Sequence, residues 1–336
     1  MIHLLLLSAA LAADPTACTP SWTRHRPGLA ESGATTWDAC GRLIDDHDHS
    51  LGTERDHHQQ STWTWEGDLP VVREVHWTQE LHASGVLVDK SEITEVGWQG
   101  DLPVRLRFTS SEGSRPTGVV ETTLRWDGER LVHKRICTDP DSARHCRTTT
   151  WTWSGDRLLT EHRPNGTRSH YAWEGGAPVA EEVEVGGERE VVQTARYDAS
   201  GQMTGHEQYG AIRTSTRLRW NDRFQLVASE HDYRGRTYHA WMEELDGRRA
   251  IRSDYGSDAW LRWDPQDRLL ATGGTAGEAA LEWSGQCTPD LAAPSFAQST
   301  ELRVPQIDPR SHITPASVLE YAGIYITGRP GYGPLT

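Results

Sequence analysis

Residues that can bind a metal ion are most concentrated in one short stretch, DDHDHSLGTERDHH at residues 45–58. Imidazole and carboxylate groups suit zinc and similar divalent metals. The candidate ligands in this stretch are His47, His49, His57, His58, Asp46 and Asp48. Because ligands must converge on one point and nothing in the sequence fixes such a point, we favour a solvated acidic loop. The sequence indicates no cofactor.

The five cysteines of the chain are interpreted first as disulfides, as in other exported proteins. Cys137 and Cys146 flank a Pro-Asp turn, so they face each other if this segment is a hairpin. Cys18 and Cys40 are predicted to form a disulfide that ties the N-terminal segment to the first repeat. Closing this loop would stabilise the folded protein by about 3 kcal/mol. Cys287 is then left as a buried free thiol.

One tryptophan is a candidate for contact with a glycan or a partner protein. In AWLRW, Trp260 is in the opposite phase to Leu261 and Trp263, so in a strand it points outward when they point inward. Packing at the edge of a sheet is the alternative role for this side chain.

Catalytic motifs are weak. The chain contains no Gly-x-Ser-x-Gly, no His-Glu-x-x-His and no phosphate-binding loop. Paired carboxylates for glycoside hydrolysis cannot be picked out from 48 acidic residues without geometry. We therefore assign no catalytic residue, and the sequence favours a protein that is not an enzyme.

A recurring aromatic residue, followed at once by a polar turn, organises the rest of the chain. These anchors recur every 20 to 33 residues, a period typical of solenoids, propellers and other repeat arrays. They are Trp37, Trp65, Trp98, Trp126, Trp153, Trp173, Tyr197, Trp220, Trp241, Trp263 and Trp283. Apolar and polar residues alternate before each anchor, as in a strand, and turns such as EGD, DGE and SGD follow it. Each unit is therefore predicted to be two short strands, whose indoles stack from unit to unit in a shared core.

This pattern resembles the RHS, or YD-repeat, family, whose unit reads roughly Tyr-Asp-x-x-Gly-Arg-Leu. The best matches are WDACGRL at 37–43 and YDASGQM at 197–203, and the resemblance covers about 37–287. It implies a long β-sheet ribbon of hairpins, often coiled into a hollow shell around a toxin or polymer. This chain differs in using Trp mostly in place of Tyr, in its short array, and in lacking a family-type core segment or toxin module.

The fold class that we predict is all-β. About eleven β-hairpin repeats form a twisted sheet ribbon or partial shell, and the alternative is a β-propeller of about five blades. Four segments follow: a signal peptide at 1–12, an N-terminal cap at 13–36, the repeat array at 37–287 and a Pro-rich C-terminal tail or cap at 288–336.

The start of the chain and its charge indicate where the protein works. MIHLLLLSAALA fits a secretory signal with an Ala-x-Ala cleavage site, which predicts a secreted or periplasmic bacterial protein. The net charge is −14 and no basic stripe is present, which argues against nucleic acid as a partner. No stretch approaches the roughly 20 apolar residues of a membrane span.

Two classes of function remain. The first, which we favour, is a non-catalytic exported repeat protein, a structural or interaction module whose partner is an envelope glycan or another protein. The second is an extracellular enzyme that acts on polysaccharide through paired carboxylates, or a component of a polymorphic-toxin system. A cleft with two close carboxylates of raised pKa favours the enzyme, whereas a filled shell favours the module.

Overall fold

The computed structural model describes residues 18–26, 29–40, 42–140, 145–222, 226–245, 248–254, 259–263, 269–274 and 278–284, together with Pro315 and Val318. The predicted signal peptide, Cys287 and all other residues of 288–336 lie outside these ranges.

The described residues form one antiparallel sheet of 22 strands. Their bounds are β1 Thr19–Arg26, β2 Leu29–Trp37, β3 Leu43–Gly52, β4 Arg55–Glu66, β5 Leu69–Leu81, β6 Val86–Gln99, β7 Leu102–Glu112, β8 Arg115–Asp127, β9 Arg130–Cys137, β10 Cys146–Ser154 and β11 Arg157–His162. The second half comprises β12 Arg168–Glu174, β13 Ala177–Val185, β14 Glu188–Tyr197, β15 Met203–Gln208, β16 Thr214–Trp220, β17 Leu226–Tyr233, β18 Arg236–Leu245, β19 Arg248–Ser253, β20 Ala259–Trp263, β21 Leu269–Gly274 and β22 Glu278–Ser284.

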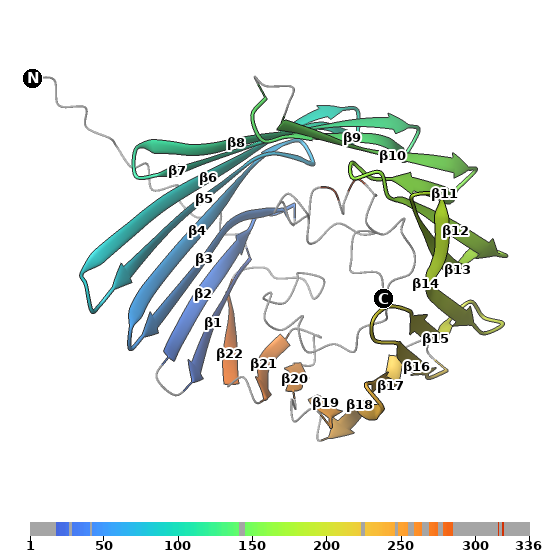
Figure 1. The fold of residues 1–336 in the computed structure, drawn as a ribbon. Coiled ribbons are helices and arrows are strands. Elements are labelled where there is room, and N and C mark those ends of the chain that lie inside the picture. Colours follow the sequence, from blue (N-terminus) through green and yellow to red (C-terminus); the bar gives the residue numbers. More distant parts are fainter. Residues whose placement is uncertain are drawn as a thin grey trace, which may run out of the picture.

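Every strand pairs with its neighbours in the chain, so the whole array is a succession of hairpins. The last strand also pairs with the first, from Thr19 opposite Ser284 to His25 opposite Glu278. The sheet therefore curls round until its two ends meet, and we call the result the sheet ring (Figure 1). The predicted all-β hairpin array is confirmed. The propeller alternative is wrong, because separate blades would interrupt the continuous pairing from β1 to β22. The segment 13–36, predicted as a cap, contributes β1 and most of β2 to the ring.

Each anchor from Trp37 to Trp220 lies on an even-numbered strand, just before a turn, and this explains the repeated sequence motif. In five units the first turn residue is a glycine with positive φ, for example 60° at Gly128 and 59° at Gly175, a conformation that other residues adopt at a cost. Most anchors also coincide with a β-bulge, as between Arg125 and Trp126. The bulge shifts the register so that Trp126 lies opposite Leu131, and this pairs the two apolar residues of the unit.

The anchor indoles connect one unit to the next. Trp98 donates its Nε1–H to the carbonyl oxygen of Pro70, 3.0 Å away, and Trp126 does the same to Pro103 at 2.7 Å. In each case the acceptor is the residue opposite the preceding anchor. The same bond recurs from Trp65 to Leu43, Trp153 to Leu131, Trp173 to Leu158 and Trp220 to Met203. The indole thus buries its apolar face and satisfies its one donor in the same contact.

The arginine of the motif makes the reciprocal link to the following unit. Arg130 donates to the carbonyl oxygen of Gly155 in the next turn, 3.0 Å away. Arg42 and Arg157 donate in the same way to Gly67 and Gly175. The units of Trp126 and Trp153 are therefore bonded backward through the indole and forward through the guanidinium.

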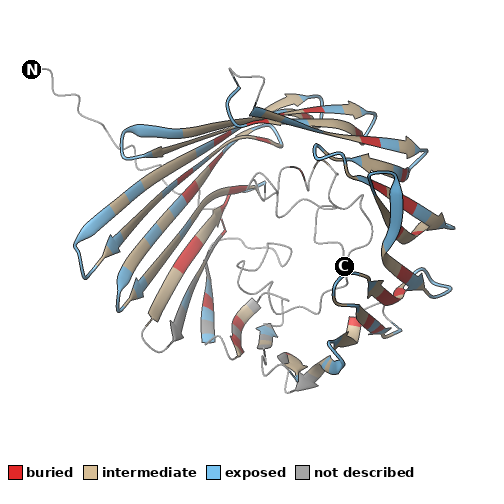
Figure 2. Cartoon of the chain, in the orientation of Figure 1, coloured by how far each residue is buried: buried red, intermediate tan, exposed pale blue. Residues whose placement is uncertain are grey.

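The apolar residues gather on one face of the sheet, because directly paired residues of neighbouring strands point to the same side. The largest buried cluster contains Trp37, Leu43, Trp63, Val96, Leu106, Leu124, Leu131, Trp151, Leu158, Tyr171 and Cys18. Val318, only 3% exposed, belongs to the same cluster. The red piece of chain near the C-terminus lies within the sheet ring (Figure 1), so we call this face the inner face. Figure 2 shows the buried residues recurring from strand to strand.

Eight anchors fit the predicted aromatic ladder and one does not. Those from Trp37 to Trp220 pack against the two buried clusters. Trp241 was predicted to join them, but it lies opposite Ala228 and Arg252, with no bulge and well before its turn. Ala228 is opposite the exposed Arg219, so Trp241 faces outward. Alignment on tryptophan alone therefore misplaced this unit. The side chains of Trp263 and Trp283 lie outside the described part of the chain.

Candidate functional site: the polar inner wall

The stretch predicted as a solvated acidic loop, with a metal site as the alternative, is not a loop but the β3–β4 hairpin. Asp46 pairs with Ser61 and Asp48 with Gln59, whereas His49 pairs with His58. Since Ser61 is fully buried, the even-numbered residues of β3 and the odd-numbered residues of β4 face inward. Asp46, Asp48 and His57 therefore lie on the inner face, and His47, His49 and His58 lie on the outer face. Strand alternation separates the six candidate ligands into two groups that cannot share one ion.

The inner aspartates have unusual protonation behaviour. Burial, together with the negative charges of Asp48 and Asp45, raises the pKa of Asp46 to about 7. Burial also raises the pKa of Asp48, while His47 and His57 act in the opposite direction. Burial lowers the pKa of His57. On the inner wall, Asp46 therefore changes charge near neutral pH, and the pKa of its neighbour Asp48 is shifted in the same direction.

The outer histidines form contacts with rings and carboxylates. The rings of His49 and His58 are 5.8 Å apart between centroids, and His47 lies 3.6 Å from Asp45. Within the described ranges, no group of three or more His, Cys, Asp or Glu residues is arranged to hold a metal ion.

A second polar group crosses the inner wall from β11 to β15. Arg163 lies 3.1 Å from Glu161 and 3.9 Å from Glu181, and the hydroxyl of Tyr171 donates to Glu161 at 3.4 Å. Gln193 donates to the other oxygen of Glu181 at 2.5 Å. His206 extends this network, its Nε2 3.0 Å from Oε1 of Gln193.

The chemistry of this network is structural rather than catalytic. Both glutamates already interact with a guanidinium or an amide, and Glu181 is only 9% exposed. Burial raises the pKa of Tyr171 above its ordinary value, and burial lowers that of His206. A buried carboxylate needs hydrogen-bonding or charged partners, and Glu181 takes both from neighbouring parts of the sheet. The network therefore fixes the register of five strands.

Sequence reasoning missed the polar side chains of the inner face, although the repeated motif contains a signal for some of them. The residue four positions before the anchor is small and polar in most units: Ser61, Thr94, Thr122, Thr149, Ser169 and Thr216. Two strand periods separate it from the anchor, so it shares the inner face. All of these except Thr149 are at most 9% exposed.

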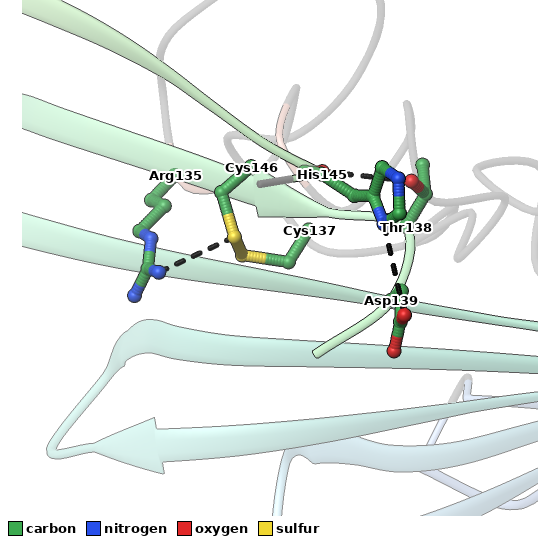
Figure 3. The surroundings of a disulfide bond; sticks show 6 residues. All are labelled: Arg135, Cys137, Thr138, Asp139, His145 and Cys146. Atoms are coloured by element: carbon green, nitrogen blue, oxygen red, sulfur yellow. Dashed lines mark hydrogen bonds and ion pairs between the residues drawn. A yellow bond between two sulfur atoms is a disulfide. The ribbon is translucent and has the colours of Figure 1, made fainter. Parts of the chain in front are cut away.

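The structure contains the disulfide between Cys137 and Cys146 (Figure 3). The two residues are directly paired at the ends of β9 and β10, with their Cα atoms 4.1 Å apart. Nη2 of Arg135 lies 3.2 Å from the sulfur of Cys146. The bond closes the segment that connects the two strands and stabilises this hairpin by about 2–3 kcal/mol.

The predicted pair of Cys18 with Cys40 is wrong. Cys40 is an exposed free thiol in the turn between β2 and β3. Cys18 is 1% exposed and disulfide-bonded, and its backbone exchanges hydrogen bonds with Trp37. The turn carries Cys40 away from this buried position, because Asp38 accepts its amide hydrogen and that of Arg42, both at 2.9 Å.

Trp260 lies on the outer face, as its phase predicts. It is paired with Ala250, which is paired with Glu243, two residues from the outward-facing Trp241. Its indole lies over Gly273, so closely that a Cβ there would be 2.5 Å from the ring. One side of Trp260 is therefore covered by the neighbouring strand, and the side chain is half-buried. Contact with a glycan stays a prediction.

No protein-family model matches the chain, and no curated protein matches it. Solved structures give low similarity. A crystal structure of TcdB2-TccC3 has a TM-score of 0.35 and 10% identity over 75% of this chain, and so has the Tc holotoxin pore of Photorhabdus luminescens. A porin-like protein from Bacteroides uniformis has a TM-score of 0.27 and 9% identity, and the match covers 81% of this chain and 99% of that one. The chain spans about a quarter (24%) of the length of the TcdB2-TccC3 chain. Similarity at this level carries no functional inference.

Among the residues described, no helix has the length and apolar character needed to cross a membrane.

Proposed function

We propose that this chain is a non-catalytic, exported repeat protein that serves as a structural or interaction module at the envelope of a bacterial cell or outside it. The observation that carries this proposal is the indole ladder. Six indoles bond to carbonyl oxygens of the preceding units and line a continuous ring of strands. In this arrangement the role of the repeated motif is to link neighbouring hairpins rigidly. The burial of Val318 within the ring favours a filled shell.

The partner classes follow from the charge. The net charge of −14 disfavours nucleic acid and anionic lipid, and leaves a neutral glycan or another protein. We further propose that the chain is a short, tryptophan-rich relative of the RHS, or YD-repeat, proteins. The turn of YDASGQM supports this, because Asp198 accepts the amide hydrogens of Ser200 and Gln202 at 2.9 and 3.0 Å and thereby gives the motif's Asp a structural role.

Export is tested by expressing the full chain in a bacterial host and sequencing the N-terminus of the protein recovered from the periplasm and the medium. We expect a mature start after Ala12. Full-length protein that stays in the cytoplasm would overturn the export part of the proposal.

A second candidate function, hydrolysis of polysaccharide, is favoured by one observation, the raised pKa values of Asp46 and Asp48 on the inner face. A general acid that is protonated near pH 7 beside a second carboxylate is what glycoside hydrolysis requires. A screen of reducing-sugar release from soluble polysaccharides separates the two functions. We expect no turnover by the wild-type protein. Turnover that disappears in both Asp46→Asn and Asp48→Asn would replace the module by the enzyme.

A further inference from the structure

The outer face of β16–β18 carries a groove of about 450 Å³ that the ladder does not explain. Its outward-facing lining comprises Arg217, Arg219, Ala228, Glu230, His239 and Trp241. The floor is low because Ala228 lies between the longer side chains of Arg219 and Trp241, to which it is paired on its two neighbouring strands. A hollow of this size on a sheet face is in the range of sites for small ligands.

Among the anchors whose side chains the structure describes, Trp241 is the one that faces outward. Its indole does not reach the preceding unit but donates to Oε1 of Glu243 on its own strand, at 2.7 Å. This bond fixes the orientation of a half-buried indole on the outer face. A flat aromatic surface held in this way offers a platform for stacking, because the face of an indole carries partial negative charge.

Polar groups of both charges flank the platform and are held in place by one another. Nε of Arg217 donates to Oε2 of Glu230 at 2.7 Å, and Nδ1 of His239 lies 3.9 Å from the other oxygen of the same carboxylate. Asp254 lies at the end of the groove, where it accepts the amide hydrogen of His239 at 3.2 Å. Guanidinium and carboxylate groups each provide two hydrogen-bonding atoms in one plane, which match a pair of adjacent hydroxyls.

A second indole lies on the same face. Trp241 is paired with Arg252 on β19, and Trp260 is paired with Ala250, two residues away on the same strand. Standard strand spacing therefore places the Cα atoms of the two tryptophans roughly 12 Å from each other. The outer face of β16–β21 thus presents two indoles with charged, planar hydrogen-bonding groups beside one of them.

We infer that this face is an oligosaccharide-binding site, in which a pyranose ring stacks on Trp241 and its hydroxyls bond to Arg217, Glu230 and Asp254, while Trp260 supports a further ring of the same chain. The C–H groups of a pyranose are weakly positive and suit the negative face of an indole. The inference names the ligand class of the proposed interaction module. It rests on that proposed function only in part, because binding is measured on purified protein whether or not the protein is exported.

The test is titration calorimetry of the full chain with cellohexaose, chitohexaose and hexagalacturonate, which also distinguishes neutral from acidic sugars. We expect saturable binding of at least one of them. Trp241→Ala should weaken it by about tenfold, which corresponds to about 1.4 kcal/mol, because the variant removes the stacking surface. Glu230→Gln should weaken it as well, whereas Tyr233→Ala, which removes an exposed aromatic at the far end of β17, should leave it unchanged.

Two results would overturn the inference. One is the absence of heat for all three sugars up to about millimolar concentration. The other is binding that Trp241→Ala leaves at wild-type strength. The thermal unfolding of each variant is measured beside the titration, and if Trp241→Ala proves misfolded, the loss of affinity in Glu230→Gln decides the inference. An exported, inactive protein that binds none of the sugars would overturn the ligand class and leave the module intact.

Discussion

At the scale of single residues, the indole in six of the units does two things that no other side chain combines. It fills the space between two hairpins, and its one N–H satisfies a carbonyl oxygen beside the buried bulge. Phenylalanine would do only the first. The ladder is therefore specific for tryptophan, and tyrosine at position 197 is the one anchor between Trp65 and Trp220 without the indole bond to the preceding unit.

Replacing Trp98 by Phe tests the value of this bond. The change removes the donor to the carbonyl of Pro70 while keeping most of the apolar surface, so the free energy of unfolding should fall by about 1–3 kcal/mol. Chemical denaturation followed by circular dichroism measures it. Trp241→Phe, on the outer face, is the matched control and should change stability by less than about 0.5 kcal/mol. Equal effects of the two substitutions would contradict the ladder.

Asp46 should make stability depend on pH. Its pKa rises from 3.8 in the free carboxyl to about 7 in the folded protein, so folding favours the protonated form. The contribution of protonated Asp46 to the stability of the folded protein is complete below about pH 4 and is lost as the pH rises through about 7. Asp46→Asn removes this loss and should raise the free energy of unfolding at pH 8 by about 1–3 kcal/mol, with little effect at pH 4.

The melting temperature of Asp46→Asn and the wild type, measured from pH 4 to pH 8, checks this expectation. Asp127→Asn is the control, because that side chain is 73% exposed and its substitution should give a difference that does not vary with pH. A constant difference for Asp46→Asn across the whole range would mean that Asp46 ionises normally in the folded protein.

At the scale of elements, the hairpin turns decide the register. The turn between β12 and β13 contains two adjacent glycines that differ in backbone conformation. Gly175 has a φ of 59°, whereas Gly176 lies outside the left-handed region, and a Cβ at either would meet no atom within 4 Å. Conformation alone therefore distinguishes the two positions.

This pair gives an internally controlled prediction. Gly175→Ala should lower the free energy of unfolding by about 1 kcal/mol, because alanine is strained at positive φ. Gly176→Ala should be neutral or stabilising, because it only restricts the unfolded chain. Thermal unfolding of the two variants measures the difference, and a larger loss at Gly176 would show that the turn has another conformation.

At the scale of the whole molecule, closure of the sheet removes both of its edges, which otherwise invite association with other chains. The strands are unequal around the ring. Those from β4 to β8 have 11 to 14 residues, whereas those from β19 to β22 have 5 to 7. Closure therefore depends on the shortest strands, and the inner core must help to hold the ring together.

Val318 tests that contribution. It is more than 30 residues beyond the last strand, yet it is 3% exposed within the main cluster. Val318→Asp would bury a charge there, so we expect a loss of at least about 3 kcal/mol and greater quenching of tryptophan fluorescence by acrylamide. Leu159→Asp, at a position that is 40% exposed, is the control. Unfolding and quenching like those of the wild type would remove Val318 from the core.

The sequence by itself determined the number of hairpins, the positions of eight anchors, the Cys137–Cys146 pair and the outward direction of Trp260. These depend on strand period and turn chemistry, which are local and are written in adjacent residues. It did not determine on which face of the sheet Asp46 and its neighbours lie, because only the register with β4 decides this. For the same reason the sequence did not predict that the side chain of Trp241 faces outward. The presence or absence of a β-bulge depends on the pairing of two strands and not on one strand alone.

Closure of the sheet was decided only by the tertiary structure. The strand pairing between β1 and β22 joins residues that are some 250 positions apart, and no local preference encodes such a contact. It arises from the twist accumulated over every hairpin between them.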